Sequence, residues 1–355
     1  MSDLLTDVFA GDAFSVVELT DAINLVPTQY GLLNKLGIFQ EEGIPTTSVA
    51  VEFNNGVLNL IPSKPRGETP HKNISAKRSL KHFTVPHFPV GDKIFPSDVQ
   101  NVREFGTNQL RTPESVMNKK LIELSNKHDI TNEWLKCGAI AGKILDADGS
   151  TLLDLFSEFN VSETQIFFDL DDEDADIVGS SQEVLGSIED NLQGDVMDYA
   201  MAACSPQFWA KFITHPKVQA AYTNYQNSVN SVVGYAGPSA NPGRNDVRKG
   251  FYFGGMLWAE YRGKATYTAD DGTITTQNFI ETNMARFFPV GTNSSFKHYN
   301  APADNMEAVN TVGQPKYAQV TRDPKGKFWD VDTESNPLPL CLRPKLLVKG
   351  NLASS

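Results

Sequence analysis

Residues 112–145 read TPESVMNKKLIELSNKHDITNEWLKCGAIAGKIL. Thr112 can accept a hydrogen bond from the free amides of a helix N-terminus, and Pro113 suits the first helical position. Apolar and small residues then recur at steps of three or four, which places them on one helical face. The spacing predicts one helix over 113–145, about 50 Å long at ~1.5 Å per residue, with two shorter helices that meet at His128 and Asp129 as the alternative. The predicted buried face consists of Met117, Leu121, Leu124, His128, Thr131, Leu135, Ala139 and Gly142.

Residues 146–149 (Asp-Ala-Asp-Gly) have the composition of a turn and should end this helix. They also resemble the start of a calcium loop. However, the glycine is fourth in the loop instead of sixth, and Ser157 stands at the twelfth position, where a glutamate ligand belongs. The acidic run at 169–176 lacks the same glycine and glutamate. A plain turn and a solvated loop are therefore predicted, and no metal site.

The composition is that of a globular chain without a membrane span. Of its 355 residues, 40% are hydrophobic, and no apolar run approaches the ~20 residues that cross a bilayer. The N-terminus carries acids where a signal peptide carries bases, so export is not expected. Three scattered cysteines without a CxxC pair favour reduced thiols in a cytoplasm over a disulfide framework or a zinc site.

The net charge of −12 is unevenly distributed along the chain. Residues 144–210 contain sixteen Asp or Glu and no Lys or Arg, so the remainder of the chain is net positive. Residues 63–81 reverse this balance, with six bases against Glu68 alone. Either run taken singly is most simply a solvated surface, but two opposite patches on one chain also suit head-to-tail self-association. No basic face with interleaved aromatic residues indicates nucleic-acid recognition.

A β-hairpin is predicted before the long helix. Apolar and polar residues alternate from Val49, and after Asn-Asn-Gly, the strongest short-range hairpin signal, a return strand is expected at 57–61. Residues 62–82 are rich in proline and basic residues. The segment 45–90 should therefore form a two-stranded excursion with a basic tip, which is marginal in water without a partner surface. Residues 1–45 are expected to form an extended arm with one or two short helical turns.

The second half of the chain lacks the alternation of strands and helices typical of a doubly wound nucleotide-binding sheet, so the predicted class is α+β. Neither GxGxxG, GxxxxGK[ST], HExxH nor GxSxG occurs, and the six histidines are dispersed. No catalytic constellation and no cofactor is predicted. The chain from Gly350 onward is expected to fray. Strands are predicted at 160–168, 251–261, 264–269, 274–276, 285–290 and 339–348, a strand or helix start at 197–203, and helices at 180–192 and from Ser205.

Five motifs follow one another in the last part of the chain. They are RFFPVGT (286–292), FKHYNAPAD (296–304), VNTVGQP (309–315), ESNPLPL (334–340) and Arg343-Pro344. In this order and spacing they resemble the major capsid proteins of lambda-type tailed bacteriophages, the capsid protein E family. The front half is similar to that family as well, with its hairpin, Arg66-Gly67 and the long helix that leads into 146–149. The resemblance covers essentially the whole chain.

The resemblance implies a Hong Kong 97-like phage capsid fold of the α+β class. The implied function is a structural head protein, not an enzyme, that self-assembles in the host cytoplasm into the icosahedral shell of the virion around the phage genome. The implied divisions are an N-terminal arm (1–45), an extended β-hairpin loop (46–90), a peripheral domain (91–160 and 270–355) with its spine helix at 113–145, and an axial domain (161–269).

The resemblance also implies partners. Copies of the chain would form hexamers and pentamers, with a portal, a scaffolding protein and a decoration protein as further candidates, and would enclose DNA without sequence-specific binding. A separate scaffolding protein is expected because the arm reaches the hairpin within about fifty residues, too few for a long helical scaffold.

The two charged runs then become candidate contact surfaces. The hypothesis is that the basic loop tip of one subunit lies on an acidic face of its neighbour. The alternatives are a cytosolic hydrolase that uses dispersed Asp, Glu and His, which the missing motifs oppose, and another phage structural protein such as a tail or adaptor part, which the long helix opposes. The proposed contact residues are Lys64, Arg66, Lys72, Lys77, Arg78, Asp171, Asp172 and Asp174.

Overall fold

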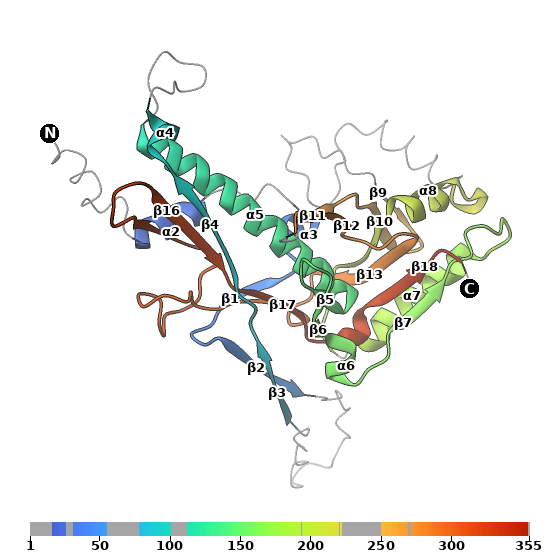
Figure 1. Ribbon diagram of the computed structural model, residues 1–355. Helices are drawn as coiled ribbons and strands as arrows, with labels where there is room; N and C mark the ends of the chain where they lie inside the picture. Colours follow the sequence, from blue (N-terminus) through green and yellow to red (C-terminus); the bar gives the residue numbers. More distant parts are fainter. Residues whose placement is uncertain are drawn as a thin grey trace, which may run out of the picture.

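The computed structural model describes residues 16–25, 31–54, 78–100, 112–192, 194–219, 221, 250–268 and 271–353. Its long helix, α5 (Pro113–Ala141), runs diagonally through the molecule (Figure 1). Thr112 caps this helix as predicted, because its side-chain oxygen accepts a hydrogen bond from the Ser115 amide at 3.2 Å. Because α5 is unbroken from Pro113 to Ala141, the prediction of one continuous helix is confirmed over the alternative of two shorter helices.

The predicted helix end at 145 is wrong. α5 ends at Ala141 because Gly142 adopts a left-handed conformation (φ 80°), which glycine reaches without steric cost. β5 (Lys143–Leu145) then pairs antiparallel with β6 (Thr151–Asp154). The predicted turn at 146–149 is confirmed, since it joins these two strands.

The other elements form three larger sheets, two further strand pairs and the flanking helices. The helices are α2 (Val16–Leu25), α3 (Leu32–Leu36), α4 (Pro96–Val99), α6 (Leu155–Phe159), α7 (Ile177–Asn191), α8 (Pro206–Thr214) and the 3-10 helix η2 (Pro344–Leu346). The six-stranded sheet contains, in spatial order, β7 (Thr164–Phe167), β18 (Val348–Asn351), β13 (Met284–Val290), β8 (Tyr199–Cys204), β10 (Met256–Glu260) and β9 (Gly250–Phe253). The three-stranded sheets are β1 (Gln40–Gly43), β14 (Phe296–Asn300) and β17 (Pro337–Cys341), and β15 (Tyr317–Arg322), β16 (Trp329–Ser335) and β4 (Phe88–Ile94). The pairs are β2 (Ser48–Asn54) with β3 (Arg78–Thr84), and β11 (Lys264–Thr268) with β12 (Ile274–Asn278).

The buried side of α5 is broader and more polar than its apolar spacing predicts. Most of the predicted face is buried, although Thr131 is only half-buried and Gly142 lies beyond the helix. The helix also buries Asp129, Glu133 and Lys136, and the spacing had placed Lys136 away from this face. The buried members of the predicted face are Met117, Leu121, Leu124, His128, Leu135 and Ala139.

The two halves of α5 enter different cores. Its N-terminal half packs with α2 against the β15–β16–β4 sheet, where Met117 and Leu121 meet Ile94 and Val331. Its C-terminal half belongs to a larger cluster that also holds α3, β17 and one face of the six-stranded sheet. Because α5 belongs to both clusters, it joins the two ends of the molecule seen in Figure 1.

The six-stranded sheet is covered on one face by α7 and α8. On β8, Ala200 and Ala202 face these helices, whereas Met201 and Ala203 face the α5 cluster, as the two-residue repeat of a strand requires. The helix side is largely aromatic; the Phe212 and Trp258 rings, for example, stack with centroids 4.0 Å apart. β8 is therefore buried on both faces, which explains its continuous run of small and apolar residues.

The predicted two-stranded excursion is present at its base. β2 pairs antiparallel with β3, with Ser48 opposite Thr84 and Asn54 opposite Arg78. The pair projects away from the body of the molecule (Figure 1). The predicted Asn-Asn-Gly turn and the return strand at 57–61 lie outside the described residues, apart from Asn54 itself.

Three predictions need correction. The predicted strand at 339–348 is not continuous, because β17 ends at Cys341 and the 3-10 helix η2 separates it from β18. The segment 251–261 forms two antiparallel strands, β9 and β10, because Gly254 and Gly255 adopt positive φ values of 60° and 85° and reverse the chain. The residues from Gly350 do not fray at their start, since β18 extends to Asn351 and is bonded between β7 and β13. The hairpin of β11 and β12 and the helices α7 and α8 agree with prediction, with α7 beginning at Ile177 instead of 180.

Candidate functional site: subunit-contact surfaces

The base of the β2–β3 pair is anchored to the body by apolar and aromatic side chains. Val49, Val51 and Phe83 are all buried, and the Phe83 ring stacks on Phe159 with centroids 6.2 Å apart. Lys81 lies 3.4 Å from the carboxylate of Glu158. The predicted loop therefore has a firm attachment within its own chain.

Of the predicted basic residues, the structure describes Arg78. Arg78 begins β3, opposite the last residue of β2. Lys64, Arg66, Lys72 and Lys77 lie outside the described residues.

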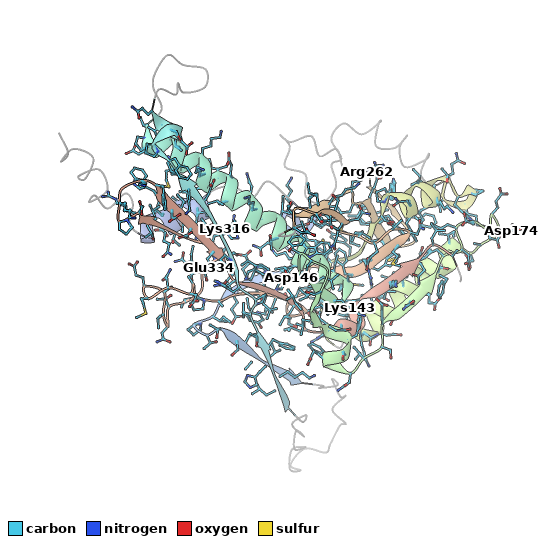
Figure 2. All side chains as sticks on the ribbon, in the orientation of Figure 1. Lys143, Asp146, Asp174, Arg262, Lys316 and Glu334 are labelled. Atoms are coloured by element: carbon cyan, nitrogen blue, oxygen red, sulfur yellow. The ribbon has the colours of Figure 1, made fainter. Side chains whose placement is uncertain are left out.

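The predicted acidic residues are brought together on the loop between β7 and α7. Asp171, Asp172 and Asp174 are all exposed, and Figure 2 shows Asp174 at one extreme end of the molecule. The chain itself supplies bases to this loop. Lys211 of α8 forms an ion pair with Asp171, and Lys217 donates to the Asp174 carbonyl oxygen at 2.6 Å. Sequence spacing did not reveal these two lysines as neighbours of the loop.

The N-terminal segment is held on α5 by a buried carboxylate. The Glu133 side chain accepts hydrogen bonds from the amides of Leu33 and Asn34 at 2.8 and 2.9 Å. It also accepts one from the Tyr261 hydroxyl at 2.6 Å. Lys136, one helical turn away, donates to the Asn34 side chain at 2.8 Å. The arm segment from α3 is thus fixed in register by polar groups of α5.

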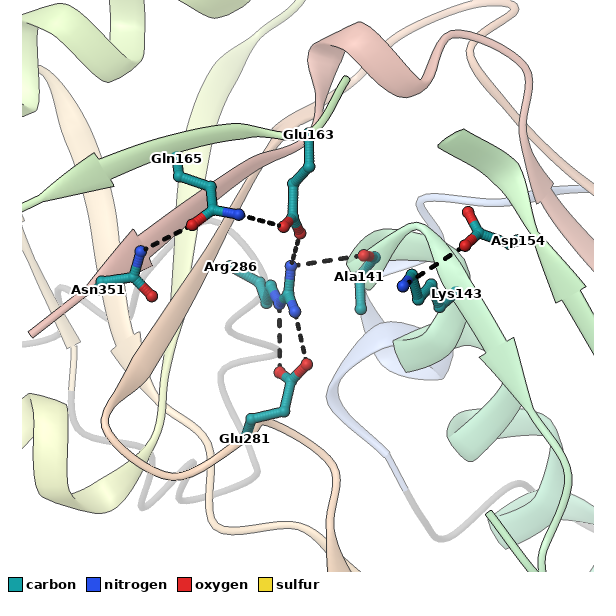
Figure 3. Close-up of polar contacts among 8 residues, drawn as sticks. All are labelled: Ala141, Lys143, Asp154, Glu163, Gln165, Glu281, Arg286 and Asn351. Atoms are coloured by element: carbon teal, nitrogen blue, oxygen red, sulfur yellow. Dashed lines mark hydrogen bonds and ion pairs between the residues drawn. The ribbon is translucent and has the colours of Figure 1, made fainter. Parts of the chain in front are cut away.

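A buried guanidinium joins α5 to the six-stranded sheet (Figure 3). Arg286 of β13 donates to Glu163 at 2.8 Å and, in a forked arrangement, to both carboxylate oxygens of Glu281. It also donates to the Ala141 carbonyl at the end of α5, at 3.4 Å. Burial alone would raise the pKa of the Glu281 carboxyl, but the hydrogen bond and charge of Arg286 hold that pKa below its ordinary value.

Two further polar contacts cross from α5 to the β15–β16–β4 side of the molecule. Lys316 lies 2.6 Å from Asp129, and both side chains are buried. His128 Nε2 lies 3.0 Å from the Thr333 hydroxyl, which itself donates to the Val90 carbonyl at 2.9 Å. The histidine therefore donates to Thr333. His128 was predicted on the buried face, but no local signal identified Lys316 or Thr333 as its surroundings.

The described ranges contain no helix that is both long and apolar enough to cross a membrane. In the same part of the chain, no group of three or more His, Cys, Asp or Glu side chains is placed to hold a metal ion. Cys137, Cys204 and Cys341 are all free and buried.

Sequence relatives share nearly the whole length of this chain. The family model for phage major capsid protein E matches residues 15–352. The major capsid protein of Pseudomonas phage KPP10 is 31% identical over 353 residues, which cover 96% of this chain and 97% of that protein. The major capsid protein of Salmonella phage Felix O1 (isolate Felix O1-VT1) is 29% identical, with 94% and 95% covered.

Solved structures share the fold. A prophage protein of Escherichia coli CFT073 assigned as a capsid protein superposes with a TM-score of 0.62 at 14% identity, over 95% of this chain and 99% of that one. The capsid of Ralstonia phage GP4 gives a TM-score of 0.53 at 8% identity, over 92% and 90%. At such identities the likeness concerns the fold alone, which is the mixed α+β fold of Hong Kong 97-like capsid proteins. Because the family match spans nearly all of its length, the chain belongs to the phage major capsid protein E family.

Proposed function

We propose that copies of this chain close into the icosahedral shell of a tailed-phage head and thereby enclose the phage genome. The observation that carries this proposal is the match of the capsid family over residues 15–352. Proteins of this family are structural components of the virion capsid and not enzymes, so the hydrolase alternative is set aside. The function is geometric, because repeated contacts between copies replace any reaction at a single site.

The β2–β3 pair supports a loop that crosses to a neighbouring subunit. An isolated two-stranded ribbon is marginal in water, and the anchoring contacts described for this one lie between its inner end and its middle, at Val49, Val51, Lys81 and Phe83. Leu80, near its outer end, is exposed to 55% in the single chain. Residues 46–90 therefore act as the extended loop, and residues 1–45 as the N-terminal arm.

The two cores support the remaining divisions. We assign 91–160 and 270–355, with α5 as the spine helix, to a peripheral domain, and 161–269 to an axial domain. β13 and β18 come from the range 270–355 but lie in the six-stranded sheet with strands of 161–269. The axial core accordingly includes these two strands, and Arg286 on β13 secures the junction to α5.

Charge complementarity supports a contact between the basic loop tip and an acidic surface of the neighbour. The tip supplies Lys64, Arg66, Lys72, Lys77 and Arg78, and the loop that holds Asp171, Asp172 and Asp174 is one candidate for the acidic surface. The acidic loop carries six acids at 169–176, against which the described structure places Lys211 of α8 and Lys217, so the acids outnumber these two bases. Such pairs act mainly on encounter rate and register, and salt weakens them.

Further partners are proposed on the basis of the family match. Hexamers and pentamers of this chain, a portal, a separate scaffolding protein and a decoration protein would complete the head. Enclosed DNA would touch the shell without base-specific contacts, since the chain is net negative and repels phosphate.

Particle size tests this function. We expect the purified chain, alone or with a co-expressed scaffolding protein, to form shells, capsomers or sheets of megadalton mass in light scattering and negative-stain microscopy. High salt should dissolve them. A small closed oligomer under every condition, with the scaffolding protein present, would contradict the proposal.

A further inference from the structure

The outer face of the β15–β16–β4 sheet carries no covering element in the described part of the chain. On the central strand β16, Val331 and Thr333 point toward α5. The intervening residues Asp330, Asp332 and Glu334 therefore point to the opposite side, as the strand repeat dictates. Three acids thus stand in a row on one face of this sheet.

A groove of about 280 Å³ lies over this face. Asp332 is at its centre, with Gly91 of β4 on one side and Gln319 of β15 on the other. A side chain at Gly91 would collide with the Asp332 carboxylate, because a Cβ there would lie 2.5 Å from it. The absence of a side chain at position 91 therefore leaves room for this carboxylate and keeps the groove open.

The three acids differ in their partners. Asp330 lies 3.6 Å from Lys93, and Glu334 accepts from the Asp304 amide and the Asn336 side chain. The Asp332 side chain forms no hydrogen bond or ion pair with the described residues. Partial burial and the neighbouring Asp330 raise the pKa of Asp332, and the charge of Lys93 offsets this only in part.

The loop that lines one side of the groove at Asn305 carries exposed aliphatic side chains farther along the chain. Asn305 lines the groove, and the next residue in its loop, Met306, is 90% exposed. Val309 and Val312 of the same loop are also exposed. The acidic floor of the groove fits a lysine or arginine, because a carboxylate accepts charge-assisted hydrogen bonds from either side chain.

We propose that this groove receives the basic segment 64–78 of a second copy of this chain, with Asp332 as the acceptor of a lysine or arginine. The inference rests on the proposed shell function and changes where the basic segment binds. The acidic loop at 169–176 already has Lys211 and Lys217 beside it, whereas Asp332 is unpaired among the described residues. Nucleic acid is not a suitable occupant, because the row of acids would repel phosphate.

The direction of the β2–β3 pair favours a neighbouring copy over the same chain. Arg78 stands at the outer end of β3, and Thr84 stands at its inner end. β4 begins beyond that inner end, at Phe88. The β2–β3 pair and the β15–β16–β4 sheet extend in opposite directions from the middle of the molecule (Figure 1), and Glu334 in Figure 2 marks the near end of the sheet. Arg78, the described end of the basic segment, thus lies on the side of the molecule away from its own groove.

Cysteine cross-linking tests the contact directly. The three native cysteines are buried, so single introduced cysteines report their own surroundings. Chains with Asp332→Cys would be co-assembled with chains carrying Lys64→Cys, Arg66→Cys, Lys72→Cys or Lys77→Cys, and the particles oxidised. We expect a covalent dimer with at least one of these partners. Asp171→Cys serves as the matched control at the competing acidic surface and should give none.

Charge variants supply a second measurement. Asp332→Lys should raise the concentration needed for half-maximal assembly about tenfold or more at low salt, and Asp332→Asn should raise it less. Urea unfolding of the unassembled variants should match the parent chain, because the Asp332 side chain has no partner among the described residues. Glu307→Lys is the control for an added charge on the nearby loop.

The outcomes separate this inference from the shell function. Particles that form normally but cross-link through Asp171→Cys, or to a different protein through Asp332→Cys, would overturn the groove assignment and leave the shell intact. Normal assembly of Asp332→Lys would do the same. Failure of the parent chain to form particles with its scaffolding protein would instead refute the shell function itself.

Discussion

Lys316 and Asp129 form an ion pair inside the protein, with the ammonium nitrogen 2.6 Å from a carboxylate oxygen and both side chains at most 6% exposed. Lys316 precedes β15, and Asp129 lies near the middle of α5. The ammonium also donates to the Ser125 hydroxyl at 2.7 Å. The core around the N-terminal half of α5 is therefore stabilised by a buried ion pair as well as by apolar side chains.

Removing one member of this pair should be costly. Lys316→Met leaves the Asp129 carboxylate buried without its partner, for which a loss of about 3–5 kcal/mol in the free energy of unfolding is expected. The double variant Lys316→Met, Asp129→Leu should recover most of this loss, because no unpaired charge remains. Urea unfolding of the unassembled chain measures both. Lys119→Ala, which breaks the exposed pair with Glu123, is the control and should cost less than about 0.5 kcal/mol. Equal losses at both sites would contradict the role of burial.

Glu133 should decide whether the N-terminal segment stays docked. Glu133→Ala removes the acceptor for Leu33, Asn34 and Tyr261, and a loss of about 2–4 kcal/mol in local stability is expected. Hydrogen exchange at the amides of Leu33 and Asn34 should accelerate while amides of β8 stay protected. Tyr261→Phe removes only one hydroxyl and should have a smaller effect. Unchanged exchange at both amides would show that apolar contacts alone hold the segment.

Acid should weaken the fold through His128. Burial, with Lys316 and Lys127, lowers the pKa of this histidine to about 4 from 6.5. Between these two pH values, the unfolded chain therefore binds a proton at His128 that the folded chain does not bind. The contribution of neutral His128 to the free energy of unfolding is fully present above pH 6.5. It is lost as the pH falls toward 4, by at most about 3 kcal/mol. His128→Gln should reduce the slope of unfolding free energy against pH in this window. An unchanged slope would assign the acid sensitivity to other groups, of which His298, with a pKa also lowered by burial, is the first to test.

The junction at Arg286 should require a guanidinium and not merely a positive charge. Arg286→Lys loses the forked contact with Glu281 and should cost about 2 kcal/mol. Arg286→Met should cost more, since Glu163 and Glu281 lose their shared cation. Glu281 has a depressed pKa in the folded state, so its contribution is present above its unfolded pKa and fades as the pH falls through the folded value. Arg286→Met should abolish this loss of the Glu281 contribution at low pH. Lys143→Met, at the exposed pair with Asp154 in Figure 3, is the control, and a similar loss there would contradict the prediction.

Local chemistry in the sequence was sufficient for the elements whose signals are short-range. Thr112 and Pro113 start α5 as predicted, and Ser205 and Pro206 start α8 in the same way, because caps and the first helical position depend on neighbouring residues only. The turn at 146–149 and the β11–β12 hairpin follow from their turn residues. The motifs between 286 and 344 identified the family without knowledge of the fold.

Predictions from short-range patterns failed where one or two glycines interrupted a longer apolar pattern. Gly142 ends α5 before the predicted position, although the apolar spacing continues to Leu145. Gly254 and Gly255 divide a segment that looks like one strand.

The sequence by itself determined the long helix, its cap, the opposed charge runs and the family, since each depends on residue types and spacing along the chain. Only the tertiary structure decided which polar groups are buried and satisfied. Glu133, Asp129 and Lys136 look like solvent-facing residues of a helix, yet their partners Leu33, Lys316 and Asn34 come from segments distant in sequence. The same holds for Asp332, whose lack of a described partner appears only once Gly91 and Gln319 lie on either side of it. A buried or unpaired charge is a property of the surroundings, and those surroundings are assembled from the whole chain.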